Sequence, residues 1–377
     1  NRHAIIPAFN NYGDIVVEVF NKLEQLMPPA KLELLNNVGK VATDYGVSVY
    51  IVGGTVRDIL LDRTPRDVDI VVEGDGIKLS HILASTLGGS VVAVSRFLTS
   101  KLRIKGNVFD VVTARTESYP RPGALPIVSQ GSLRDDLARR DFSINAMALK
   151  INIWGKEPII DPFGGQKDLE HSQVRILKET NFRDDATRIM RAIKYEKRLG
   201  MVLEKRTEAL LISDLSMLDT IEGYRLRKEL KLWFEEPRCS SILVRASDLG
   251  VIWALDHGLN EGVKFVRKAS WLWNNTMDTE KFWLSLIAYF MDYDECSHFI
   301  TRFGFSDSSA KIIMAMNRLR SLADSLILTD KIDLQFQDYL RCYDDSILRV
   351  VALINRNNIV GEHIDMYLSK TKPHRAR

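Results

Sequence analysis

The stretch DVDIVVEG, Asp67 to Gly74, begins with two carboxylates one residue apart and continues into three apolar residues. The apolar run predicts a buried β-strand. Residues i and i+2 of a strand point to the same face, about 6.6 Å apart at a rise of roughly 3.3 Å per residue. Two acids this close repel each other unless a cation lies between them. A polar start of a strand is the plainer interpretation, and the stretch by itself leaves both open.

The surrounding sequence mixes strand and helix patterns between residues 47 and 160. Strand patterns occur in VSVYIVGG, SVVAVS, SKLRIKG and NVFDVVTA, and the last two predict a hairpin that turns at Gly106-Asn107. Helix patterns occur in TVRDILLD, GIKLSHILASTLG and DDLARRDFSINAMALK. Residues 14–45 are also helical in pattern and are expected to pack against this domain. The sequence therefore predicts an α/β head with a small mixed sheet and flanking helices.

Two other regions depart from this pattern. Residues 115–132, RTESYPRPGALPIVSQGS, carry three prolines and little periodicity, which predicts a loop of about 18 residues with a functional or mobile role. Beyond Asp184 the strand signal fades and amphipathic helices take over, so the second half is predicted to be all-α. The final SKTKPHRAR predicts a basic tail.

Bulk composition limits the class of protein. The 377 residues are 45% hydrophobic with a net charge of +3, which fits a soluble globular chain and permits an acidic partner such as RNA. No apolar run approaches the roughly 18 residues of a membrane span, so we expect a cytoplasmic protein without membrane contact. Three widely spaced cysteines indicate neither a disulfide framework nor a zinc site. The start at Asn1 rather than Met suggests processing or excision.

Two further features could take part in chemistry. IVGGTVRD places Gly53-Gly54 between a predicted strand and a helix, where the backbone can approach a phosphate. A tight strand-to-helix turn is the alternative. Asp110 in NVFDVVTA is available as a third acid beside Asp67 and Asp69, or is only a surface charge on an edge strand. Acids placed in this way suit Mg²⁺, and two-ion phosphoryl transfer uses such bridging carboxylates.

Five motifs in order make the chain recognisable: GGTVRD, DVD, RRDFSINAMA (139–148), DPFGG (161–165) and DDATRIMRAIKYEKRLG (184–200). Over about residues 45–235 the chain resembles the bacterial-type, class II tRNA nucleotidyltransferase and poly(A) polymerase family. The resemblance implies a polymerase-beta-like head and an all-α C-terminal half. It also implies four segments: a helical 1–46, a catalytic head 47–160, a neck 161–236 that recognises the base, and a helical RNA-binding body and tail 237–377.

The resemblance implies roles for the motif residues. Asp67 and Asp69 match the catalytic metal-binding acids, with Asp110 as a candidate third. The matched nucleotide-binding positions are Gly53, Gly54 and Arg57 for the triphosphate, and Arg139, Arg140, Asp141 and Asn145 for phosphates and ribose.

Base recognition is implied for the stretch Asp184 to Arg188, where Asp184 replaces the usual Glu. Asp185 and Arg188 are three residues apart, hence neighbours on one face of a helix. A carboxylate accepts from the amino group of cytosine or adenine and a guanidinium donates to the ring acceptor, so the pair can select C and A. An intrahelical ion pair is the plainer reading.

Basic residues follow on two predicted helices. Arg188, Arg191, Lys194 and Arg198 share roughly one face, where like charges repel unless solvent or an anion such as RNA phosphate neutralises them. Arg191 is also assigned to the nucleotide. Arg225, Arg227, Lys228 and Lys231 form a second candidate RNA contact. Trp271, Trp273 and Trp283 are expected in the helical core rather than as base-stacking platforms.

The family resemblance implies a tRNA 3′-terminal nucleotidyltransferase that adds the terminal A or the whole CCA, using Mg²⁺, ATP and possibly CTP, on the acceptor and T arms of tRNA. Poly(A) polymerase activity is the alternative. A head acting on a small molecule is disfavoured by the large basic helical half, and an inactive RNA-binding head by the intact acids. The length of 115–132 resembles A-adding and CCA-adding relatives and disfavours CC-only addition.

Overall fold

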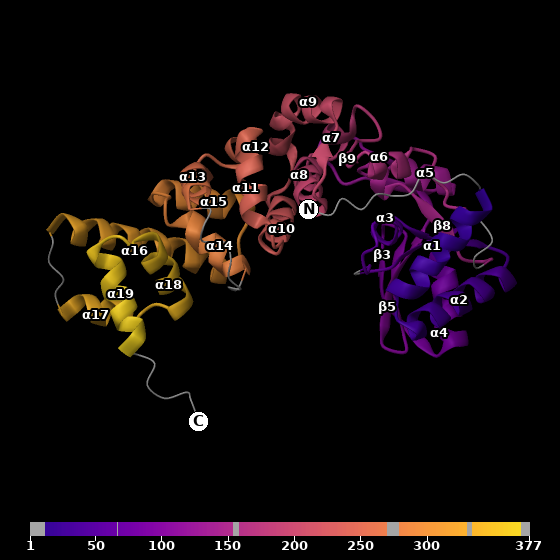
Figure 1. Ribbon diagram of the computed structural model, residues 1–377, viewed down its shortest axis with the longest axis horizontal. Coiled ribbons are helices and arrows are strands. Elements are labelled where there is room, and N and C mark those ends of the chain that lie inside the picture. The colour runs from indigo at the N-terminus through magenta and orange to yellow at the C-terminus, as the bar shows by residue number, and fades with distance from the viewer. Residues whose placement is uncertain (1–11, 66, 154–157, 270–278, 330–333, 371–377) are drawn as a thin grey trace. The chain divides into compact units, whose positions relative to one another are not determined.

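The computed structural model describes residues 12–65, 67–153, 158–269, 279–329 and 334–370. The chain forms two compact units, and both are visible in Figure 1. The first comprises residues 1–184 with 200–210, and the second comprises 185–199 with 211–377. The predicted neck 161–236 is thus divided between the two units. The finer division into four segments stays a prediction.

A six-stranded mixed sheet organises the first unit. Its strands run in the order β3-β4-β5-β2-β1-β8, with β2 and β5 parallel and the other neighbours antiparallel. The strands are β1 (Ser48–Val52), β2 (Asp69–Glu73), β3 (Gly89–Ser95), β4 (Thr99–Ile104), β5 (Asn107–Thr113) and β8 (Ala148–Lys150). β4 and β5 form the predicted hairpin, but the turn is Lys105-Gly106, both with positive φ, and Asn107 already pairs with Ile104.

Both faces of the central strands are buried. Val49, Ile51 and Ile70 alternate with Tyr50 and Val52 along β1 and β2, as strand geometry requires. Leu133 and Leu137 of α5 (Leu133–Ala138) join the core around Tyr50, Val52 and Val71. Helix α4 (Gly76–Leu87) packs on β3, β4 and β5, α2 (Pro29–Asp44) packs on β1, and α1 (Tyr12–Leu26) contacts α3 (Gly54–Leu60).

The segment 115–132 is not the irregular loop that its prolines predict. β6 (Arg115–Ser118) and β7 (Ile127–Gln130) form an antiparallel hairpin around the proline-containing residues 119–126. The strands are only four residues long, too short for alternation to appear in the sequence.

The prediction of one helix over 135–150 is wrong. A capping box between Ser132 and Asp135 starts α5, and the helix ends before Arg139. Phe142 is extended and bridges to Ile176, a 3₁₀ turn follows at Ser143–Asn145, and the chain then enters the sheet as β8 beside β1. The apolar residues at 142, 144 and 147 are all buried in the core. Their spacing happens to match that of one face of a helix, so the sequence pattern indicates burial but not the conformation.

The rest of the first unit consists of short elements. Asp161 of the DPFGG motif accepts hydrogen bonds from the backbone of Gly165 and Gln166 and so begins the next helix. These elements are α6 (Gly165–Glu170), β9 (Gln173–Val174), α7 (Asn181–Asp184), β10 (Val202–Leu203) and α9 (Lys205–Ser213), of which the last three residues belong to the second unit.

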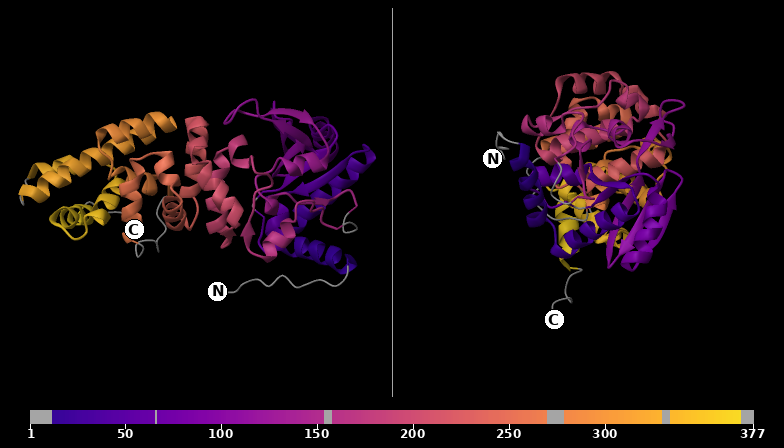
Figure 2. Two further views of the ribbon diagram at one scale, coloured as in Figure 1. Left: turned by 90° about the horizontal axis from the view of Figure 1, so that it is seen from above. Right: turned by 90° about the vertical axis from the view of Figure 1, so that its right-hand side faces the viewer.

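The second unit is helical in its described residues, as predicted (Figure 2). Its early elements are α8 (Thr187–Leu199), η2 (Leu215–Thr220), α10 (Gly223–Phe234), α11 (Cys239–Asp248), α12 (Val251–Leu255) and α13 (Leu259–Lys268). Its later helices are α14 (Thr279–Ala288), α15 (Tyr293–Phe303), α16 (Asp307–Thr329), α17 (Leu334–Leu340), α18 (Asp345–Ile354) and α19 (Ile359–Lys370). The predicted fold class, an α/β head followed by an all-α half, is confirmed.

Three further predictions can be placed. Trp283 is buried in the helical core, as expected. Trp271, Trp273 and all of the basic tail beyond Lys370 lie outside the described residues. Among the helices that the structure describes, none is long and apolar enough to cross a membrane.

Candidate active site

The predicted metal-binding acids gather at one end of β2. Asp69 is the first residue of β2 and pairs in register with Asp110 on the parallel neighbour β5. Adjacent strands lie about 4.8 Å apart, and in-register parallel residues point to the same face. Burial raises the pKa of Asp69, Arg140 opposes this, and Asp110 and Asp67 add to the rise. The carboxylates therefore repel one another, and a cation between them would relieve the repulsion.

Asp67 is positioned differently from the prediction. It precedes β2, so strand alternation does not place it on the face of Asp69. Its backbone carbonyl accepts a hydrogen bond of 2.9 Å from Thr55 Oγ1, which ties it to α3. Across the described ranges no three His, Cys, Asp or Glu side chains form a ready metal cage. Two or three carboxylates with room for water and phosphate suit Mg²⁺ better than such a cage does.

Asp110 also has a cation beside it. Lys101 lies opposite Asp110 on β4, and its Nζ is 3.0 Å from Asp110 Oδ1. Both side chains are more than a third exposed, so this ion pair is screened by solvent and easily exchanged. The open alternatives for Asp110, third acid or surface charge, are thus both compatible with its position.

Gly53 connects the glycine motif to the arginine motif. Its φ of 69° favours glycine, and a Cβ there would lie 2.5 Å from Arg140 Nη1. Its N–H donates to the carbonyl of Met147, which lies within the arginine motif RRDFSINAMA. Glycine is therefore needed at position 53 because the guanidinium of Arg140, from the same unit, lies against its backbone.

Arg57, a predicted triphosphate contact, is only 3% exposed. Its Nη1 donates to Asn145 Oδ1 at 2.5 Å, and its Nε and Nη2 donate to Asp58. Asn145 in turn donates to Asp141 Oδ1 at 2.9 Å. The predicted phosphate and ribose positions are thus joined in one buried hydrogen-bonded chain, in which Arg57 orients the motif from inside.

Arg139 and Arg140 share a carboxylate that the sequence analysis missed. Asp136, 0% exposed, accepts from Arg139 Nη2 at 2.6 Å through Oδ1 and from Arg140 Nη2 at 3.0 Å through Oδ2. Burial alone would raise the pKa of Asp136, but Arg140 and Arg139 hold this pKa below its ordinary value. In sequence Asp136 resembles any helix acid at i−3 or i−4 from an arginine.

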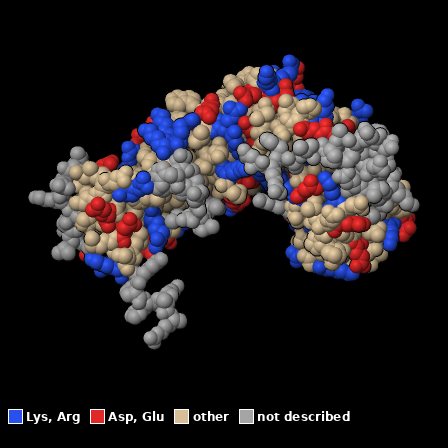
Figure 3. Space-filling view, in the orientation of Figure 1, with Lys and Arg blue, Asp and Glu red and all other residues tan. Residues whose placement is uncertain are grey.

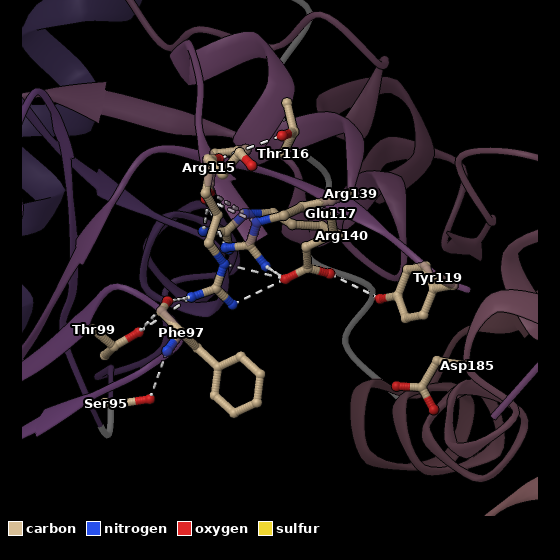
Figure 4. A network of polar contacts seen from close by, with 12 residues as sticks. Ser95, Phe97, Thr99, Arg115, Thr116, Glu117, Tyr119, Arg139, Arg140 and Asp185 are labelled. Carbon is tan, nitrogen blue, oxygen red and sulfur yellow. Dashed lines mark hydrogen bonds and ion pairs between the residues drawn. The ribbon is translucent and has the colours of Figure 1, made fainter. Parts of the chain in front are cut away.

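Glu117 of β6 is a second carboxylate that the sequence analysis missed (Figure 4). Its Oε1 accepts from Arg139 Nη1 and from Arg115 Nη2, both at 2.9 Å, and its Oε2 accepts from Tyr119. Burial would raise the pKa of Glu117, but Arg139, Tyr119 and Arg115 lower it below its usual value. The β6–β7 hairpin is therefore bound to the arginine motif through Glu117.

The predicted base-reading pair has a different geometry from the one expected. Asp185 precedes α8 and accepts from the backbone and hydroxyl of Thr187, so it caps the helix rather than lying on its face beside Arg188. Its Oδ2 lies 2.8 Å from Nη2 of Arg225 on α10. Asp184, the last residue of α7, pairs instead with Lys178 at 2.6 Å.

Several predicted RNA contacts are inside the helical packing. Lys194 is 5% exposed, and its Nζ is 3.1 Å from Glu229 Oε2 on α10. Arg191 and Arg198 lie 3.7 and 3.8 Å from carboxylates of Glu229 and Glu236. The contact of Lys194 with RNA stays a prediction, and the burial of Lys194 and its ion pair with α10 weigh against it. Arg188 is also buried, whereas Arg191 and Arg198 are partly exposed.

The second basic block is mostly occupied as well. Arg225 holds Asp185, Arg227 donates to the carbonyl of Phe303, and Lys231 pairs with Glu280 at 2.9 Å. Lys228 is exposed and makes no ion pair in the described part of the chain. Figure 3 shows basic and acidic side chains intermixed on the visible face of this unit.

Comparison with known proteins gives the family. The Poly A polymerase head domain model matches residues 49–175. The A-adding tRNA nucleotidyltransferase of Geobacter sulfurreducens is 39% identical over 238 residues, 62% of this chain and 27% of that protein. A solved tRNA-processing enzyme, apo form I, is 30% identical with a TM-score of 0.72 over 93% of each chain. The chain belongs to the class II tRNA nucleotidyltransferase family.

Other members of the class II tRNA nucleotidyltransferase family match to different extents. The A-adding enzyme of Aquifex aeolicus is 38% identical over 67% of this chain, and the Thermotoga maritima CCA-adding enzyme in complex with tRNA is 27% identical with a TM-score of 0.76. The alignment with the Thermotoga maritima structure covers 95% of this chain and 87% of that chain. The alignment with the Aquifex aeolicus enzyme covers only 32% of that protein. The chain thus spans less than two thirds of the first curated relatives.

Proposed function

We propose that the chain is a tRNA 3′-terminal nucleotidyltransferase that adds the terminal A, or the whole CCA, from ATP and CTP without a nucleic-acid template. The observation that carries the proposal is the pairing of Asp69 with Asp110 beside Arg140. The names of the family members, A-adding and CCA-adding tRNA nucleotidyltransferases, support tRNA as the acceptor. A cytoplasmic location, where tRNA and nucleotides meet, is part of the proposal.

Mg²⁺ fits the donor set at the end of β2, because Asp67, Asp69 and Asp110 offer only carboxylate oxygens. These residues would hold the ion, which would supply charge stabilisation at the transferring phosphate and favour ionisation of the attacking 3′-hydroxyl. Asp69 starts a rigid central strand, and Thr55 fixes the Asp67 backbone. These contacts support a site that is ordered before the ion binds.

Arg139 and Arg140 are proposed to bind the phosphates of the nucleotide. Both guanidiniums are already oriented by carboxylates, and Gly53 leaves room for Arg140. Such preorganised donors stabilise developing charge without reorganisation during the reaction. Asp141 and Asn145, held by the Arg57 chain of hydrogen bonds, are proposed to contact the ribose.

Asp185 is proposed to read the base. Its carboxylate is fixed by Thr187 and Arg225, and an ionised carboxylate only accepts hydrogen bonds. Cytosine and adenine offer it an amino group, whereas uracil and guanine offer a carbonyl. An acceptor facing an acceptor leaves both unpaired, which costs enough for strong discrimination.

The proposal is tested with purified protein, Mg²⁺ and tRNA that ends at position 73, at CC or at CCA, with each labelled nucleotide supplied singly. AMP incorporation on the CC-ended tRNA only indicates A addition, and CMP followed by AMP on the shortest tRNA indicates CCA addition. Reactions with EDTA in place of Mg²⁺ are the control. Long A tails on unrelated RNA, or no incorporation on any tRNA, would overturn the proposal.

A further inference from the structure

A densely connected polar cluster surrounds the two motif arginines, apart from the predicted metal acids. Asp136 meets Arg139 and Arg140 through separate carboxylate oxygens, with four hydrogen bonds of 2.6 to 3.3 Å from their Nε and Nη2 atoms. Glu117 meets the remaining edge of Arg139 through Nη1. Hydrogen bonds to carboxylates therefore fix the orientation of each guanidinium plane.

We propose that Asp136 is a positioning residue that holds Arg139 and Arg140 in the orientation in which they bind nucleotide phosphates, and that Glu117 completes the grip on Arg139. The identity of the ligand, a nucleotide phosphate, rests on the proposed function, whereas the hydrogen bonds of Asp136 and Glu117 to the arginines do not. Asp136 is fully buried behind the arginines and acts through them.

Stability alone is a weak reason for such a cluster. A buried ion pair costs desolvation that its attraction often fails to recover, so apolar residues of similar volume frequently serve as well or better. A planar, bidentate contact instead fixes the direction of the guanidinium. Gly53 also indicates that the direction of the Arg140 guanidinium matters, because a Cβ at this position would collide with Arg140 Nη1.

The charges of the cluster favour an anionic ligand. Three guanidiniums, Arg115, Arg139 and Arg140, share two carboxylates, Glu117 and Asp136, so the cluster keeps one net positive charge. A phosphate group is an anion whose planar oxygen pairs match the guanidinium donors.

The test measures binding of inorganic tripolyphosphate by calorimetry, which needs no transfer reaction. Asp136→Asn keeps the shape but turns N–H donors toward one arginine, so we expect binding to weaken about 10- to 100-fold, the usual size of a misplacement near 1 Å. Glu117→Gln loosens only Arg139 and should weaken binding by a smaller factor. In the transfer assay both variants should raise the KM for ATP and leave the KM for tRNA unchanged.

Two acids serve as matched controls. Asp135 is the neighbouring exposed acid of α5, and Asp135→Asn retains the oxygen that caps the helix. Asp168 is a buried acid of the same unit, paired with Arg175 at 2.8 Å, so Asp168→Asn reports the general effect of losing a buried charge. Neither should change tripolyphosphate affinity.

The outcomes separate the two claims. If the wild type binds tripolyphosphate but transfers no nucleotide, the proposed function fails and the variants still decide the positioning role. Wild-type affinity in Asp136→Asn, or equal weakening in Asp168→Asn, would overturn the inference, as would a wild type that binds no tripolyphosphate. If Asp136→Asn does not fold, Glu117→Gln is the remaining test. Unchanged tripolyphosphate affinity in Glu117→Gln would then reject the proposal that these carboxylates orient the arginines.

Discussion

Two clusters of charged residues, one in each unit, differ in how the fold compensates their charge. In the first, Asp67 and Asp69 lie beside Asp110 with no ion pair to either among the described residues, and burial and mutual repulsion raise the pKa of Asp69. In the second, Lys194, Arg191 and Arg198 each lie near a carboxylate of α10 or of the turn that follows it. The two acids at the start of β2 are thus left to repel each other, whereas acids of the second unit compensate the basic side chains of α8.

The difference shows that a charged pattern in sequence does not reveal whether the fold neutralises it. A basic helix face that packs on another helix requires acids from the partner, because an unpaired buried charge is very costly. Acids at a strand end remain partly accessible, so a ligand from solution can compensate them instead. The predictions below test this contrast.

The largest effect is expected at the uncompensated acids. Asp69→Asn should lower nucleotide transfer about a thousandfold, because several kcal/mol of charge stabilisation correspond to that factor. The affinity for tRNA should stay nearly unchanged, as measured by filter binding. Asp44→Asn, an exposed acid at the end of α2, is the control. Retained activity in Asp69→Asn would remove the metal assignment.

The next effect is expected at the compensated base Lys194. Lys194→Met leaves the buried Glu229 with Arg191 alone, 3.7 Å away, and breaking a buried pair costs up to about 3 to 5 kcal/mol of unfolding free energy, which a thermal melt measures. Adding Glu229→Leu should restore much of the loss. Lys264→Met, in an exposed pair with Glu261, should change stability by less than about 1 kcal/mol. A stable Lys194→Met with weaker tRNA binding would contradict the contrast.

A smaller effect is expected at Asp185, an acid that is paired with Arg225 and still proposed to meet a ligand. Asp185→Ala should reduce the preference for CTP and ATP over UTP and GTP about 10- to 100-fold in kcat/KM, because the mismatched acceptor is gone. Asp219→Ala, an exposed acid of η2, is the control. Unchanged selectivity would show that Asp185 only caps α8.

The smallest effect is expected at Lys228. This exposed lysine has no ion pair within the described ranges, so it is the residue of its block best placed for a phosphate. Lys228→Ala should weaken tRNA binding a few-fold and reduce the slope of log affinity against log salt by about one. Lys40→Ala, on α2, is the control. An unchanged salt slope would exclude a phosphate contact at Lys228.

The sequence by itself determined the fold class, the family and the strands that carry the acids. Apolar runs bounded by glycine and polar residues identified β1, β2 and β5, because strand and helix periods are local properties of the chain. The order of five short motifs identified the family without any tertiary information. The sequence also offered Asp110, which pairs in register with Asp69, as either a third acid or a surface charge.

Only the tertiary structure decided which charges face one another. Asp136, Glu117, Glu229 and Arg225 lie far in sequence from at least some of their partners, or look like ordinary helix charges, so no local pattern singled them out. The break of the predicted helix at 139–147 has the same cause. Backbone pairing with distant segments, at Ile176 and along β1, sets the direction of the chain there. Periodicity depends on neighbouring residues only, so it indicates burial without indicating the partner.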